Sequence, residues 1–139
     1  MKVTTYLGFK GNCREAFDTY AKVLGGKITF RMTYGESPMP GTDPSAKDNI
    51  MHNTLELPGG DLLQGADAPP GQGSAHSGFC VCVSFNDAAE SKKIFDALAE
   101  GGKVQMPFDK TFWSPGFGMC IDKFGVPWMV NIEGQMPSA

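Results

Sequence analysis

A histidine within an apolar run is the residue of this sequence best suited to proton transfer. His52 lies in the segment 50–55, whose composition is typical of a strand. An imidazole titrates near neutral pH, so it suits acid–base catalysis or the binding of a polar group. Strand alternation places His52 with Thr54 on one face and Asn53 with Leu55 on the other. The second pair is typical of a covered core, which favours an open position for His52; a hydrogen-bonded structural histidine is the alternative.

Aromatic residues near the end of the chain form a second candidate for binding. Trp113 and Phe117 stand close together beside Pro115 and Gly116. Such rings stack on flat or cationic ligands, so we expect both to line a binding cavity. The alternative is that they belong to the core, and this is the stronger interpretation for Trp128.

Two cysteines two positions apart are the sequence's only hint of a thiolate metal site. Cys80 and Cys82 would share a strand face, but buried free cysteines acting as small apolar residues are commoner than metal ligands. The four cysteines show no C-x-x-C spacing, which favours a reducing cytoplasm. No signal-peptide core and no apolar stretch long enough to cross a bilayer is present, so we expect a cytoplasmic protein without membrane partners.

Charge and motifs exclude several classes of function. The chain has 139 residues, 12 Lys and Arg against 15 Asp and Glu, and a formal net charge of −3. A nucleic-acid partner is therefore not expected, because phosphate binding needs clustered cations. The sequence contains neither a G-x-S-x-G nucleophile motif nor a G-x-G-x-x-G dinucleotide motif.

Periodicity predicts two amphipathic helices, at about 13–24 and 88–100. Asn12 and Asp87 stand where N-cap side chains belong, each with a glutamate three residues later. Paired glycines follow both segments and are expected to end the helices. The remaining apolar runs are short and predict strands, at 3–9, 27–34, 50–57, 62–65, 78–85, 104–108, 116–122 and 128–132.

The two halves of the chain repeat the same order of elements. Each half predicts a strand, an N-capped helix, a glycine pair and three further strands, at an offset of about 75 residues. We therefore expect an α+β fold of two βαβββ modules, about 1–66 and 78–134, which form one domain. The modules are joined by a linker at 67–77. Two such curved sheets, each covered by a helix on one face, would enclose a cup.

The repeat and its motifs resemble the vicinal-oxygen-chelate superfamily of glyoxalase and bleomycin-resistance proteins, and most closely its PhnB-like branch. The segments that carry the resemblance are 6–17, 25–26, 98–104, 112–113 and 122–131. The resemblance implies the glyoxalase/bleomycin-resistance fold of paired sheets and a homodimer. It also implies a cavity that holds a small ligand.

The resemblance also implies where a metal ion would be held, on the first and last strand of each module. These positions fall at about Thr5, Gln64, Cys80 and Met129, and none is His, Asp or Glu. Such a set is a poor cage for zinc, nickel or magnesium, so we expect neither a metal nor another cofactor.

The function expected from the sequence is metal-free binding of a small organic molecule in the cup. The residues expected to contact it are Tyr6, His52, Gln64, Trp113, Phe117 and Asn131. One alternative is a glyoxalase-like lyase, isomerase or related enzyme with an atypical or substrate-supplied metal centre and His52 as acid or base. The other is a non-catalytic structural or interaction module.

Overall fold

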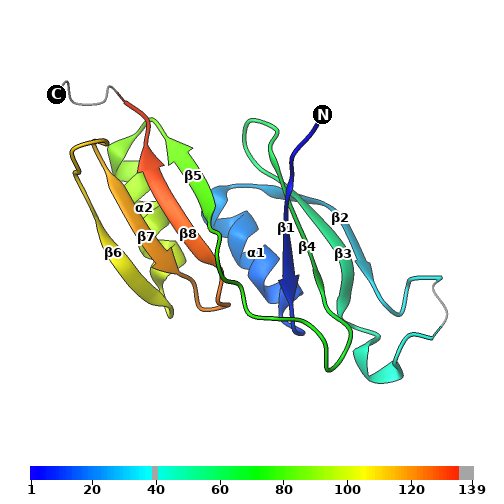
Figure 1. Cartoon of the computed structure of the whole chain (residues 1–139). Coiled ribbons are helices and arrows are strands. Elements are labelled where there is room, and N and C mark those ends of the chain that lie inside the picture. Colours follow the sequence, from blue (N-terminus) through cyan, green and yellow to red (C-terminus); the bar gives the residue numbers. More distant parts are fainter. Residues whose placement is uncertain (39–40, 135–139) are drawn as a thin grey trace. The chain divides into compact units, whose positions relative to one another are not determined.

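Every predicted helix and strand is present in the computed structural model of the chain, which describes residues 1–38 and 41–134. The chain divides into two compact units, Met1–Ser74 and Ala75–Ala139. Each unit contains one four-stranded mixed sheet and one α-helix (Figure 1). The α+β fold class predicted from the repeat is confirmed; the union of the two modules in one domain stays a prediction.

The two units share one topology. In the first, the sheet order is β1-β4-β3-β2, from the elements β1 (Thr5–Phe9), α1 (Cys13–Leu24), β2 (Lys27–Thr33), η1 (Pro44–Ala46), β3 (Ile50–Glu56) and β4 (Leu62–Asp67). In the second, the order is β5-β8-β7-β6, from β5 (Val81–Phe85), α2 (Ala88–Ala99), β6 (Lys103–Asp109), β7 (Phe117–Ile121) and β8 (Pro127–Ile132). The first and last strand of each unit pair in parallel at the sheet's edge, and the other pairs are antiparallel.

The capping of α1 differs from the prediction. Asn12 is the N-cap residue, as predicted, but its side chain makes no hydrogen bond to the helix, so its predicted role as the capping acceptor is wrong. The carboxylate of Asp67, at the end of β4, instead accepts hydrogen bonds from the amides of Gly11 and Cys13, at 2.8 and 3.0 Å. A buried acceptor from a distant strand thus satisfies amides that a helix N-terminus leaves unpaired. Asp67 was predicted to begin the linker and is the last residue of a strand.

The other helix signals hold. Gly25 ends α1 with φ 73°, in the left-handed conformation that glycine adopts without strain. Asp87 caps α2 by accepting from the Glu90 amide at 2.7 Å. Helix α2 ends at Ala99, one residue before the predicted end.

Helix α1 covers one face of the first sheet. Its buried stripe includes Phe17, whose ring lies so close to Gly65 of β4 that a Cβ there would stand 2.6 Å from it. Leu7, Leu55 and Leu63 on the same face are buried. The alternating residues of these strands therefore point to the opposite face. None of the described helices is long and apolar enough to cross a membrane.

Candidate functional site

The uncovered face of the first sheet carries a row of residues across all four strands. The strand registers place Tyr6 opposite Gln64, Gln64 opposite Thr54, and Thr54 opposite Phe30. Directly opposed residues share a face, and their side chains interact. Tyr6 and Phe30 are 53% and 45% exposed, so this face offers large aromatic surfaces to a ligand.

His52 lies on this face at the centre of a hydrogen-bonded chain. Its Nδ1 lies 2.9 Å from the Tyr6 hydroxyl, and its Nε2 lies 3.2 Å from Thr54 Oγ1. Gln64 Nε2 donates to the same Thr54 oxygen at 3.0 Å. The structure thus brings together three of the predicted site residues, Tyr6, His52 and Gln64. Thr54 completes the chain and was not among them.

Three rings form an aromatic strip over this chain. The Tyr6 and His52 rings are stacked, with centroids 5.6 Å apart and an interplanar angle of 24°. The centroid of the Phe30 ring lies 5.6 Å from that of His52, and the two rings are tilted by 47° to each other. Offset and tilted ring contacts of this kind are favourable and leave ring faces available for a planar ligand.

The number of hydrogens on Tyr6, His52 and Thr54 determines which hydrogen-bond donor these side chains offer to a ligand. When the His52 ring carries one hydrogen, Tyr6, His52 and Thr54 hold three hydrogens for the two contacts that join them, so one hydroxyl hydrogen is left over. When His52 Nδ1 carries its hydrogen and donates to Tyr6, the Tyr6 hydroxyl is free to donate outward. Burial raises the pKa of Tyr6 above its ordinary value, with Cys13 and Tyr34 adding to the rise. The phenol therefore stays protonated at neutral pH and acts as a donor.

The second unit gathers the other three predicted site residues. The register places Phe117 opposite Asn131, and Trp113 contacts Phe117 edge-on at 5.4 Å. Ser114 Oγ lies 2.8 Å from the Asn131 side-chain oxygen, to which it can donate. Phe117 is buried, and Trp113 is half-buried. That these residues line a cavity together with His52 stays a prediction, whereas the expected core position of Trp128 is confirmed by its complete burial.

The positions at which the family resemblance predicts metal ligands carry poor ligands in this chain. The register pairs Gln64 with Tyr6, whereas Thr5 lies opposite Leu63 on the helix-covered face. Met129 likewise lies opposite Cys82, and Cys80 precedes β5. Among residues 1–38 and 41–134, no group of three His, Cys, Asp or Glu side chains is arranged to hold a metal ion. The predicted donor set of Thr5, Gln64, Cys80 and Met129, which offers a hydroxyl, an amide, a thiol and a thioether, does not fit a hard divalent cation.

The cysteines differ sharply in expected reactivity. Burial raises the pKa of Cys13 to about 12 and that of Cys120 to about 11, with Asp67 and Asp122 as nearby negative charges. Cys82 is exposed. At pH 8 we expect a disulfide reagent such as DTNB to modify Cys82 rapidly and to modify Cys13 and Cys120 only after unfolding, because only thiolates react. The folded state favours the neutral thiols, so their stabilising contribution is complete below pH 9 and is lost as the pH rises from 9 towards these values.

The control for this reactivity is Cys82→Ser, which should remove the fast phase of modification and leave the slow phases unchanged. Rapid modification of Cys13 in the folded protein would contradict the expectation.

The fold resembles that of known proteins. A crystal structure of protein PA1353 from Pseudomonas aeruginosa is 42% identical, covers 97% of this chain and 99% of that chain, and has a TM-score of 0.89. FosX from Listeria monocytogenes, a fosfomycin resistance protein, shares the fold at 6% identity and a TM-score of 0.64 over 94% of this chain and 91% of that chain. The repeated βαβββ units therefore have the fold of these proteins, which agrees with the fold that the sequence motifs predicted.

Sequence comparison narrows the class to one family. Residues 1–131 match the family model described as 3-demethylubiquinone-9 3-methyltransferase, and the chain belongs to this PhnB-like family. Protein YjdN of Escherichia coli K12 is 36% identical over 147 residues, which cover 99% of both chains. A structure from Bacillus cereus, described as a putative 3-demethylubiquinone-9 3-methyltransferase, PhnB protein, is 25% identical, with a TM-score of 0.81 and coverage of 96% and 100%.

Proposed function

We propose that the chain binds a small organic molecule, without a metal ion, against the uncovered face of the first sheet. The observation that supports the proposal is the hydrogen-bonded chain from Tyr6 through His52 and Thr54 to Gln64. It lies beside exposed aromatic rings, and such a combination of apolar surface with few oriented polar groups is typical of small-molecule sites. The methyl transfer named in the family description is not part of this proposal.

The hydrogen-bonded side chains from Tyr6 to Gln64 favour a ligand with a hydrogen-bond acceptor. One hydroxyl hydrogen is left over, on either Tyr6 or Thr54. Tyr6 is the more accessible donor, since it is 53% exposed and Thr54 is only 8% exposed. A carbonyl, carboxylate or phenolate oxygen placed at Tyr6 would accept that hydrogen. A planar body on the ligand would rest against the rings of Tyr6 and Phe30.

The test is native mass spectrometry of the protein purified from its own source. We expect one organic molecule bound to each chain, with no stoichiometric divalent metal. Tyr6→Phe keeps the ring and removes the donor, so it should weaken binding about tenfold, the value of one hydrogen bond of about 1.4 kcal/mol. His52→Ala should weaken binding further, because it removes a stacking ring and leaves Thr54 without its acceptor.

Thr19→Ala is the control, since the Thr19 hydroxyl donates to the Glu15 carbonyl oxygen within α1 rather than to any residue of this site. Its ligand occupancy should equal that of the wild type. Equal ligand occupancy in all variants would mean that the ligand binds elsewhere. A metal ion that is bound to the wild type and lost in Gln64→Leu would contradict the proposal of metal-free binding. The same spectra test the predicted homodimer.

Acid–base catalysis is a second candidate function, because the two ring nitrogens of His52 both have hydroxyl partners. As a base, His52 would take the Tyr6 hydroxyl proton at Nδ1 while the Tyr6 oxygen takes a proton from the ligand, and the resulting imidazolium would donate its Nε2 hydrogen to Thr54 Oγ1. His52→Gln should then abolish turnover of a substrate while preserving part of its binding. Absence of turnover of the recovered molecule would favour simple binding.

A further inference from the structure

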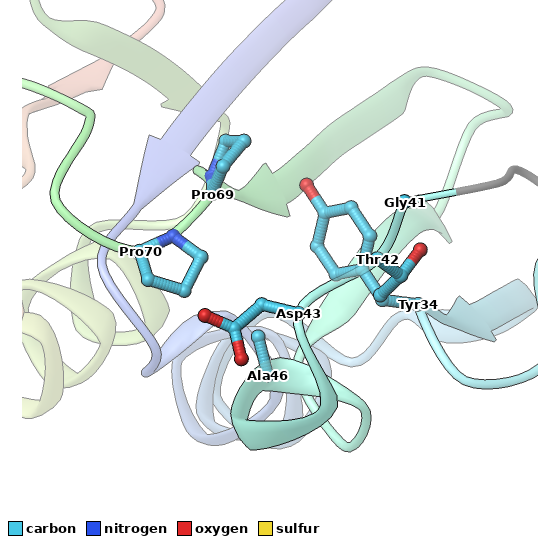
Figure 2. A pocket seen from close by; sticks show the side chains of 7 residues that line it. All are labelled: Tyr34, Gly41, Thr42, Asp43, Ala46, Pro69 and Pro70. Carbon is cyan, nitrogen blue, oxygen red and sulfur yellow. The ribbon is translucent and has the colours of Figure 1, made fainter.

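A separate cavity of about 280 Å³ lies within the first unit, between the loop after β2 and the turn after β4. Its walls include Tyr34, Ala46, Pro69 and Pro70, which are mainly apolar, and the carboxylate of Asp43 (Figure 2). None of the residues of the Tyr6–His52 chain lines it. The cavity is therefore a candidate for a second ligand.

The apolar walls are held in place before any ligand binds. The Tyr34 hydroxyl donates to the Asp67 carbonyl oxygen at 2.6 Å, which fixes the ring. Asp67 is itself anchored by three backbone amides. Proline rings have little freedom to lose. Binding would therefore cost little in ordering the site.

The carboxylate is also oriented. Asp43 Oδ1 accepts hydrogen bonds from the Ser45 amide at 2.9 Å and from the Ser45 hydroxyl at 2.8 Å. These two bonds lower the pKa of Asp43 below its ordinary value, so the group is ionised at neutral pH. In Figure 2 the Asp43 carboxylate lies below Pro70, among the residues that line the cavity. Within residues 1–38 and 41–134, no lysine or arginine forms a salt bridge with it.

We propose that this cavity binds an organic ammonium ion, with the charge beside Asp43 and the alkyl groups against Tyr34, Pro69 and Pro70. A single fixed anion without a cationic partner is complementary to one positive charge. The face of a tyrosine ring attracts the same charge. The apolar walls favour a cation that carries methyl or methylene groups over a hydrated metal ion. Lys10 lines a different hollow, which shares the two prolines, and does not line this one.

The test compares choline with 3,3-dimethylbutan-1-ol, its neutral isostere, by titration of the ¹⁵N-labelled full chain. We expect choline to shift the amide signals of residues 41–46 saturably and the neutral alcohol to bind at least about fivefold more weakly, as expected for one screened ion pair and a cation–π contact. Asp43→Asn should also weaken choline binding about fivefold. Asparagine retains an oxygen for Ser45, so this variant should keep the local fold.

Asp61→Asn is the control, because Asp61 is exposed in the turn before β4 and does not line the cavity. It should bind choline as the wild type does. Equal affinity for choline and its isostere would overturn the proposal, as would the lack of a saturable shift at residues 41–46. The isostere comparison uses the wild-type protein, so it decides the question even if a variant is unstable. Neither outcome affects the site around His52.

Discussion

Asp67→Ala is expected to lower the free energy of unfolding by about 3–5 kcal/mol, because three backbone amides, two of them in buried hydrogen bonds, would lose their acceptor. The Asp67 carboxylate is 1% exposed and accepts from Gly11, Cys13 and Ile50 at 2.8, 3.0 and 2.8 Å. It therefore ties the start of α1 and the start of β3 to the end of β4. Since domains of this size are stable by about 5–15 kcal/mol, the variant should lose a large part of its stability.

Urea denaturation followed by circular dichroism measures this loss. Asp67→Asn should fall between the wild type and Asp67→Ala, because its amide oxygen can still accept while its NH₂ group opposes an amide hydrogen. The exposed Asp61→Ala is the control and should change stability by less than about 0.5 kcal/mol. A loss of less than 1 kcal/mol in Asp67→Ala would show that water replaces the carboxylate.

The sequence predicted the elements well where the determining signals are local. The stripe of α1 and the glycine after it lie within one segment, and the helix begins and ends at the predicted residues, Cys13 and Leu24. The prediction of Asn12 as the capping acceptor failed because the acceptor lies 54 residues away, on Asp67. A hydrogen bond of that separation depends on the tertiary fold, which a local pattern does not contain.

The candidate site was predictable only in part for the same reason. Alternation correctly placed His52 with Thr54 on one face, and the family motif pointed to Tyr6 and Gln64. Thr54 itself was missed, since a threonine within a strand is ordinary and its role comes from the neighbouring strand. The cavity beside Asp43 was missed as well, because loop and turn segments more than 20 residues apart form its walls.

A second buried carboxylate anchors the other unit. Asp122 is 5% exposed and follows β7. Its Oδ1 accepts from the amides of Phe124 and Val126, both at 2.9 Å, and its Oδ2 accepts from Trp128 Nε1 at 2.8 Å. The turn between β7 and β8 and the largest side chain of the core are thus fixed by one group.

Asp122→Ala should therefore lower the free energy of unfolding by about 3–4 kcal/mol, since two amides and an indole N–H lose a buried acceptor. Trp128→Phe removes only the indole contact and part of the ring. The double variant Asp122→Ala/Trp128→Phe should consequently be more stable than the sum of the two single losses predicts, by about 1 kcal/mol or more. Asp96→Ala is the control, because this carboxylate pairs with Lys92 on the exposed face of α2 and surface pairs contribute little. Strict additivity of the two losses in urea denaturation would mean that the indole bond adds nothing to stability and that Asp122 acts through the turn alone.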